Sequence, residues 1–554
     1  MSEQQKSVII IGAGMSGLGT AAYSQMNGYQ CTVFELHETP GGCCTSWQRK
    51  EYTFDWCISW LNGTGTNNEM ATIWDELGCL ENVPIYNTEI FNSVVTANGE
   101  KIRFYVDPDK LESTLIERFP EDSKLIIELC GHIRKLRKCM PYFPFLKSSG
   151  LMTWWEKSKM MWQLLPYMRT FMKTLAVTME DFSKRFSNPT LAEALNWIIF
   201  DRHSELRLMP FVFNLACAAN QNAGVPSIGS LGLAKRLANR AKELGANIHY
   251  KSKVEHILTD NNRAVGVQLA DGSLHYADYV VASCDSYKLT RKMLQNRYPH
   301  PVLDKLFTKL EEDANSVVFP GCVAVFIAVN ADYSDHDPYT SYLLPESISR
   351  QLVGNYHSGI GVQIRNTLYP DHAPSGKSVL YVTYLSKSDA WQAMEQSVVQ
   401  STSSGQSRNP YTRKRRSPEY KQAKKKVGQA IIEFLNQYFE GLTDKVEFID
   451  VVTPLTSERY TENHNGTVLA WHPFAPLTEE LENYQIKHGP TFPNLGNFYY
   501  TGQWSTFSGV THSTASGRYV AQYLCRQDER PFRVCYPEQQ NPQPHLTNEA
   551  DNYA

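Results

Sequence analysis

Three glycines near the amino terminus have the spacing that lets a backbone approach phosphate groups. Gly12, Gly14 and Gly17 form the pattern G-x-G-x-x-G after an apolar run, and the acidic residue Glu35 follows. The first glycine permits a tight turn, the second lets a pyrophosphate approach the backbone, and the third allows close packing of a helix on a strand. Glu35 is an acceptor for ribose hydroxyls, which argues against a 2′-phosphate. The order of these residues predicts a dinucleotide-binding site.

The residues around the glycines predict the elements that position them. Residues 8–11 form an apolar run of strand length, residues 18–26 have the pattern of a helix, and residues 29–34 form a second strand. The start of such a helix presents unpaired N–H groups and a positive dipole end to phosphates. A plain βαβ unit with a glycine-rich turn is the alternative interpretation of this segment.

A second glycine pair, Gly41-Gly42, follows the acidic residue, and an NAD-binding unit does not need it. Here the chain resembles the FAD-binding families that include glutathione reductase, amine oxidases and phytoene desaturases. Residues 41–63 are most similar to the branch of phytoene desaturases, carotenoid isomerases and retinol saturases. In these families the glycine pair passes close to the pyrophosphate. Many relatives carry arginine after the pair, whereas this chain has Cys43.

Two distant segments, residues 228–285 and 497–525, extend the resemblance over essentially the whole chain. In the family, a strand at the position of Val254 borders the adenine, Gly502 reaches the pyrophosphate, and Gly509 precedes a helix whose start faces the flavin ring. The resemblance therefore implies FAD as the cofactor. The residues it implies for binding are Gly12, Gly14, Ser16, Gly17, Glu35, Gly41, Gly42, Val254, Gly502, Gly509 and Val510.

Thr511 and His512 stand where relatives usually carry a Pro-Gly pair, and they are the candidate catalytic residues. A histidine near a helix start beside the flavin ring can relay protons or stabilise an anionic flavin. The alternative is a histidine that hydrogen-bonds a neighbouring loop and takes no part in the chemistry. No metal site is predicted.

The resemblance implies an FAD-dependent oxidoreductase that desaturates or saturates carbon–carbon double bonds of a long apolar polyene, isoprenoid or acyl substrate. Such substrates predict an apolar tunnel with few titratable groups. Three alternatives stay open: a flavin-bound isomerase without net redox change, an amine-oxidase-like enzyme, and a non-enzymatic prenyl-binding escort. The intact glycine turn, Glu35 and the second glycine pair argue against the escort.

The predicted fold is α/β, with a doubly wound, Rossmann-like FAD-binding domain of the glutathione reductase type and an α+β substrate domain. The 554 residues suffice for two or more domains. The nucleotide motifs assign residues 1–85, 225–300 and 490–530 to the FAD-binding domain. Residues 86–224 and 301–489 are then the substrate domain.

Residues 151–182 mix tryptophan and methionine with lysine and arginine, and no uncharged run reaches the ~18 residues of a spanning helix. This composition fits helices in a membrane interface or beside an apolar entry channel, and equally core helices with snorkelling lysines.

Residues 396–426, rich in serine and basic residues, predict a mobile basic loop that is either solvated or touches anionic lipid. Residues 537–554 predict a poorly ordered tail.

Composition limits the kinds of binding partner and the cellular compartment that we expect for this protein. A formal net charge of −3 gives no reason to expect nucleic acid. Twelve scattered cysteines without a C-x-x-C pair favour reduced thiols, and the amino terminus has no secretory signal. We therefore expect a cytoplasmic protein with an apolar small-molecule substrate, and peripheral membrane contact is a further hypothesis.

Overall fold

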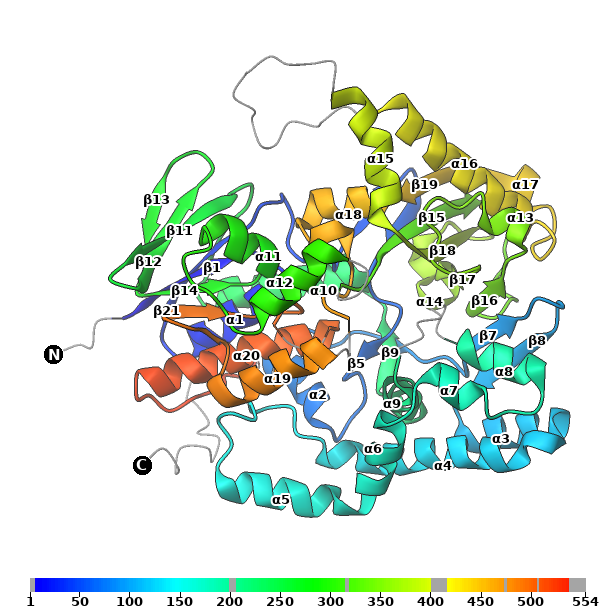
Figure 1. The fold of residues 1–554 in the computed structure, drawn as a ribbon, viewed down its shortest axis with the longest axis horizontal. Coiled ribbons are helices and arrows are strands. Elements are labelled where there is room, and N and C mark those ends of the chain that lie inside the picture. Colours follow the sequence, from blue (N-terminus) through cyan, green and yellow to red (C-terminus); the bar gives the residue numbers. More distant parts are fainter. Residues whose placement is uncertain are drawn as a thin grey trace.

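The computed structural model describes residues 5–198, 206–313, 318–399, 416–472, 476–505 and 508–537. Two large sheets, one of nine strands and one of seven, dominate the fold. Figure 1 shows them side by side, with helices of residues 108–219 along one side of the molecule.

Five parallel strands form the first sheet's central part, and they come from distant parts of the chain. In spatial order they are β10 (Asn247–His249), β2 (Gln30–Phe34), β1 (Ser7–Ile11), β14 (Tyr279–Ala282) and β21 (Leu495–Tyr500). β12 (Arg263–Leu269) and β11 (Val254–Asp260) continue the sheet beyond β21. The hairpin from β12 to β13 (Leu274–Tyr276) turns at Asp271-Gly272.

Alternate residues of these strands pack against helices on opposite faces, so both faces are buried. Ile10 and Val33 face one core, and Ile9 and Phe34 face the other. The first face is covered by α1 (Met15–Met26), α10 (Gly229–Glu243) and α20 (Val510–Gln527). The second is covered by α12 (Leu303–Glu312) and α19 (Pro476–His488). The prediction of a doubly wound α/β fold is confirmed.

The second sheet is mostly antiparallel, and its two long central strands are buried along their whole length. The strand order is β19 (Val446–Val452), β15 (Gly321–Val329), β18 (Ser378–Ser386), β17 (Gly359–Ile364), β16 (Tyr339–Leu343), β7 (Ile90–Val95) and β8 (Lys101–Tyr105). Helix α16 (Pro418–Leu435) packs on one face. On the other face lies the hairpin of β3 (Ser46–Arg49) and β4 (Tyr52–Asp55), whose Phe54 ring stacks on Phe326 at 5.0 Å.

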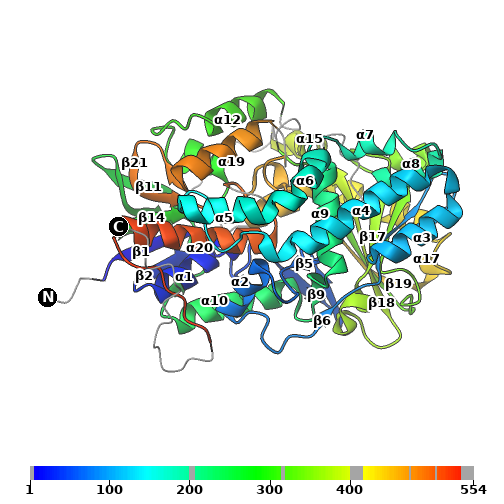
Figure 2. The same cartoon turned by 90° about the horizontal axis from the view of Figure 1, so that it is seen from below.

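A helical layer completes the molecule. Helix α9 (Leu208–Ala219) is its buried member and packs on α4 (Ser123–Cys139), with α3 (Pro108–Arg118) alongside. Figure 2 shows α4, α5 (Trp154–Leu164) and α6 (Met168–Leu175) crossing the face seen from below. No helix in the described ranges has both the length and the apolar character to cross a membrane.

The structure differs from the predicted segment assignment in two places. Helices α12 and α19, assigned to the substrate domain, pack on the first sheet through Leu306 and Leu481. The β3–β4 hairpin, assigned to the FAD-binding domain, packs on the second sheet through Tyr52 and Phe54. Strands from all three predicted FAD segments nevertheless lie in one sheet. The domain boundaries themselves stay a prediction.

The predicted loop of residues 396–426 is too long at both ends. Helix α15 (Ser388–Val399) runs into it, and α16 already begins at Pro418. The early start has a local cause, because the Ser417 hydroxyl accepts the N–H of Tyr420 and proline is favoured at the first helical position. Tyr420 is buried against the second sheet. Residues 400–415, and residues 538–554 of the predicted tail, lie outside the described residues.

Candidate functional site

The β1–α1 turn uses its three glycines for different purposes. Gly12 has a φ of +97°, and a Cβ there would lie 2.9 Å from the Ser283 carbonyl oxygen. A Cβ on Gly17 would lie 2.0 Å from the Gly12 carbonyl oxygen. Gly14 has an ordinary extended conformation, and a Cβ there would meet nothing within 4 Å. The fold therefore requires glycine at positions 12 and 17, whereas at 14 the space is left free on the pocket side.

The start of α1 has no side-chain cap. Gly14 is the N-cap residue, and the first turn contains no acidic residue. Its unpaired N–H groups and the dipole of the helix make this end attractive to an anion. The second glycine pair lies against it, because Gly41 N–H donates to the Ala13 carbonyl oxygen at 2.8 Å and a Cβ on Gly42 would lie 3.6 Å from Gly14 Cα.

Glu35 follows β2 at the edge of the same pocket and is 7% exposed. Its two carboxylate oxygens accept the N–H groups of Ala13 and His37, each at 2.7 Å. Burial raises the pKa of Glu35, and the two backbone hydrogen bonds oppose that rise. Each oxygen keeps lone-pair capacity for a further donor, which is what a ribose hydroxyl offers.

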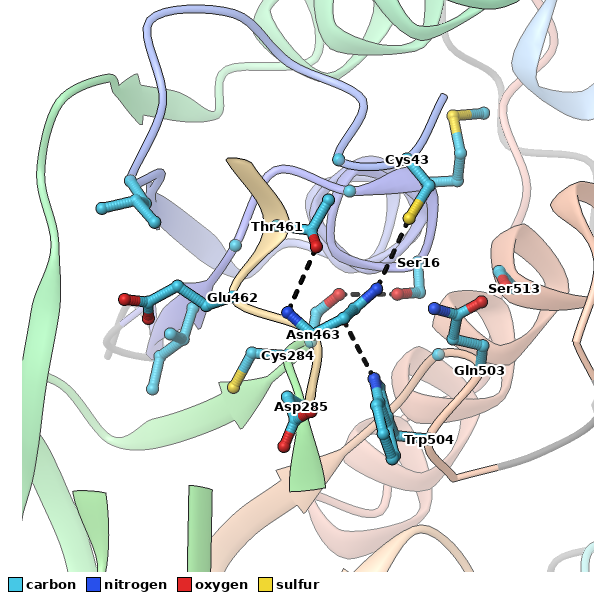
Figure 3. Close-up of a pocket in the computed structure, with 18 of the residues that line it drawn as sticks. Ser16, Cys43, Cys284, Asp285, Thr461, Glu462, Asn463, Gln503, Trp504 and Ser513 are labelled. Atoms are coloured by element: carbon cyan, nitrogen blue, oxygen red, sulfur yellow. Dashed lines mark hydrogen bonds between the residues drawn. The ribbon is translucent and has the colours of Figure 1, made fainter. Parts of the chain in front are cut away.

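These residues line one pocket with about 1280 Å³ of empty space, counting the part that opens to solvent. Figure 3 shows side chains from several distant segments converging on it. The predicted binding residues found in its lining are Gly12, Gly14, Ser16, Glu35, Gly41, Gly42, Val254, Gly502, Gly509 and Val510. Gly17 packs against the backbone of Gly12 and does not line the pocket.

Sequence reasoning missed one side of the pocket, formed by residues 460–463 at the carboxyl end of α18 (Pro454–Thr461). The side chain of Asn463 joins three segments, donating to Cys43 Sγ at 3.5 Å and accepting from Trp504 Nε1 at 3.1 Å (Figure 3). Burial raises the pKa of the Cys43 thiol to about 12, so this residue supplies no charge where many relatives have arginine. The sequence assigned these residues only to the substrate domain, since no motif marks them.

The cations of the lining are Lys253 and Lys288. Lys253 Nζ lies 2.7 Å from Glu462 Oε1, and Lys288 Nζ lies 3.7 Å from Glu458 Oε1. Burial alone would raise the pKa of Glu462, but the Lys253 ammonium holds it below its ordinary value. We therefore expect the phosphate charge of a cofactor in this pocket to be met chiefly by the α1 N-terminus.

The candidate catalytic residues lie beside the pocket, and neither belongs to its lining. The Thr511 hydroxyl donates to the Asn62 carbonyl oxygen at 2.5 Å. The half-buried His512 ring contacts Phe145 edge-on at 4.9 Å, and its Nδ1 would lie 3.4 Å from a Cβ on Gly509. Desolvation lowers the pKa of His512 to about 4, so its imidazole is neutral at neutral pH.

The pocket fits the FAD expected from the sequence. The free space at Gly14 is where a pyrophosphate would pass, the uncapped α1 start would hold its charge, and Glu35 would take the ribose. No group of three or more His, Cys, Asp or Glu side chains in the described part of the chain could hold a metal ion.

Comparisons with known proteins agree with a flavin cofactor. A model of flavin containing amine oxidoreductases matches residues 15–402. Prolycopene isomerase from Daucus carota is 25% identical over 479 residues, which cover 83% of this chain and 71% of that protein. All-trans-retinol 13,14-reductase from Danio rerio is 21% identical over 532 residues, covering 89% and 82%. The crystal structure of an oxidoreductase from Methanosarcina mazei aligns with a TM-score of 0.56 at 16% identity, covering 93% of this chain and all of that one.

The family match covers more than half of the chain and includes α1, α10 and the second glycine pair. The structural likeness supports the same fold over nearly the full length. The protein is a flavoenzyme, an oxidoreductase with FAD as its cofactor. On this evidence the chain belongs to the flavin containing amine oxidoreductase family.

Proposed function

We propose that the protein catalyses an FAD-dependent desaturation or saturation of carbon–carbon double bonds in a long apolar polyene, isoprenoid or acyl substrate. The observation that carries the proposal is the similarity to prolycopene isomerase and all-trans-retinol 13,14-reductase over 83% and 89% of this chain. Their names describe different reactions on the same kind of molecule, a conjugated chain. The bound flavin would supply the hydride or electron chemistry.

The polar residues of the pocket support a binding role and leave the chemistry to the cofactor. Both carboxylate oxygens of Glu35 accept backbone N–H groups, and those of Asp285 accept the N–H groups of Lys288 and His464. Burial raises the pKa of the Cys43 and Cys284 thiols, so neither is a ready thiolate nucleophile. These groups hold and orient the ligand, and the surrounding apolar residues exclude water.

The test is anaerobic incubation of the purified protein with candidate polyenes, read by flavin absorbance and by product mass. With oxidised flavin, desaturation should reduce the flavin and remove hydrogen from the substrate. With flavin first reduced by dithionite, saturation should reoxidise the flavin and add hydrogen to the substrate. Lipids extracted from the fresh protein provide the first candidates. Reduction of the flavin by simple amines, with no effect of polyenes, would overturn the proposal in favour of an amine oxidase.

An isomerase is the second candidate function, because prolycopene isomerase is among the relatives. Such an enzyme would bind the same apolar substrate and return a product of unchanged mass. The same experiment separates the two candidates, since only the redox reaction leaves a stoichiometric change in hydrogen content.

We also propose that His512 tunes the bound flavin. The supporting observation is its place two residues after Val510, which lines the pocket. His512→Ala should lower turnover by roughly 10²–10⁴-fold if the imidazole acts as an acid or base, with FAD content near wild type. The flavin absorbance maximum and reduction potential should also shift, which a merely structural role would not cause.

The pH dependence gives an independent check. A pKa of about 4 leaves His512 neutral throughout the range above pH 5, so wild-type turnover should show no inflection from this residue near pH 6.5. An inflection there that disappears in His512→Ala would contradict the assignment of a neutral imidazole. Unchanged turnover and an unchanged flavin spectrum in His512→Ala would show that the residue is structural.

A further inference from the structure

Residues 154–175, which we call the α5–α6 surface, expose a concentration of large apolar side chains. The segment comprises α5, the short 3-10 helix η3 (Leu165–Tyr167) and α6. Seven of the thirteen exposed large apolar side chains in the described ranges belong to it: Trp154, Trp155, Met161, Trp162, Leu165, Met172 and Leu175. The three tryptophans are 69%, 76% and 78% exposed, although tryptophan is normally well buried. Such a cluster marks an interaction site.

The two helices have the opposite arrangement from ordinary surface helices, which bury their apolar side. No residue of α5 is buried. In α6 the buried residues are Thr170 and Thr174, whereas Met172 and Leu175 are exposed. The alternative in which residues 151–182 are core helices with snorkelling lysines is therefore wrong for α5. In α6, Phe171 packs against the core, whereas Met172 and Leu175 do not.

The α5–α6 surface is nevertheless held in a defined position. Helix α5 starts with a capping box, in which the Thr153 hydroxyl accepts the N–H of Glu156 and the Glu156 carboxylate accepts the N–H of Thr153. Lys147 Nζ lies 2.8 Å from the same carboxylate. A surface that is ordered before binding loses less conformational entropy on docking.

The segment before α5 ties this surface to the cofactor pocket. Tyr519 and Gln522 of α20 donate to the carbonyl oxygens of Phe145 and Leu146, at 2.6 and 2.9 Å. The other end of α20 lines the pocket through Val510 and Ser513, as Figure 3 shows for Ser513. A single helix thus connects the α5–α6 surface with the active-site region.

The positive charges of the α5–α6 surface favour an anionic partner. Lys157, Lys159, Arg169 and Lys173 are exposed among the apolar residues, and the one carboxylate of the segment, Glu156, pairs with Lys147. A second copy of the chain would bring the same positive charges face to face, which is unfavourable. An anionic lipid surface complements both the positive charge and the tryptophans, which favour the membrane interface.

We propose that the α5–α6 surface docks on an anionic lipid bilayer, with α5 and α6 in the plane of the interface. The proposal is independent of the reaction that the enzyme catalyses.

The test is flotation of the full-length protein with two kinds of vesicle, phosphatidylcholine alone and phosphatidylcholine mixed with phosphatidylglycerol. We expect the wild type to float with the mixed vesicles only. A variant with Trp154→Ser, Trp155→Ser and Trp162→Ser should stay at the bottom of the gradient. Binding should weaken roughly fivefold for each of the four basic residues changed to glutamine.

The matched control carries Leu274→Ser and Tyr276→Ser on β13, two side chains that are 48% and 67% exposed away from the α5–α6 surface. It should float like the wild type. Equal flotation of the wild type and the tryptophan variant, or no flotation of the wild type, would overturn the proposal. An oligomer that the tryptophan substitutions convert to a monomer, without flotation, would identify a second copy as the partner instead. Flotation needs no turnover, so it stays readable if the proposed reaction is wrong.

Discussion

Replacing Gly14 with leucine is expected to give a folded protein that is purified without FAD. The backbone at Gly14 has an ordinary conformation, and the position of a Cβ is free of protein atoms within 4 Å. The fold should therefore tolerate a side chain there. That side chain would occupy the space in which the pyrophosphate approaches the α1 N-terminus, so we expect FAD affinity to fall by at least roughly a thousandfold, about 4 kcal/mol.

Gly131 provides the matched control, because it lies in α4 outside the pocket and a Cβ there also meets nothing within 4 Å. Gly131→Leu should bind FAD like the wild type. The measurements are flavin absorbance per protein, titration of the cofactor-free protein with FAD, and circular dichroism. A yellow Gly14→Leu protein with wild-type affinity would show that the pyrophosphate does not pass this position.

Arg518→Met is expected to lower the free energy of unfolding by about 3–5 kcal/mol, because it leaves a buried carboxylate without its partner. Arg518 and Glu76 are 1% and 2% exposed, and Arg518 Nε and Nη2 lie 2.9 Å from the two oxygens of Glu76. The Tyr23 hydroxyl donates to the same carboxylate at 2.6 Å. The ion pair of Arg518 and Glu76 joins α20 to α2 (Glu69–Leu77), and the Tyr23 hydroxyl adds a contact from α1.

The control for this prediction is the double variant Glu76→Gln with Arg518→Met. Because glutamine at position 76 is uncharged, the double variant leaves no buried charge without a partner. It should therefore be more stable than Arg518→Met alone. Urea unfolding followed by fluorescence measures the wild type, the single variants Glu76→Gln and Arg518→Met, and the double variant under identical conditions. Additive effects of the two substitutions would show that the pair is not energetically coupled.

Local patterns predicted the elements of the β1–α1–β2 unit well. The β1–α1–β2 unit is encoded within about 30 neighbouring residues, where strand, glycine turn and helix each follow from local propensity and backbone conformation. Gly12 and Gly17 are needed because protein atoms crowd them, so their roles are visible in a single motif. The helix after Gly509 was predictable for the same reason.

The remaining part of the site depends on contacts that no local pattern contains. Asn463 reaches Cys43 across 420 positions of the sequence, and Arg518 reaches Glu76 across 442. Single-sequence reasoning has no means to pair such residues. The same limit explains why α5 could be interpreted as either core or interface, since its composition does not tell which side meets solvent.

The position of β21 has a consequence for biosynthesis. This strand lies between β14 and β12, yet about 200 residues separate it from β14 in the chain. At roughly 5–20 residues per second, the ribosome needs on the order of 10–40 s to deliver it. During that time β14 exposes an unpaired, apolar strand edge, which is a template for aggregation. The cofactor pocket lacks Gly502 until β21 and the residues after it have been synthesised, so we expect FAD to be bound only after that point of translation.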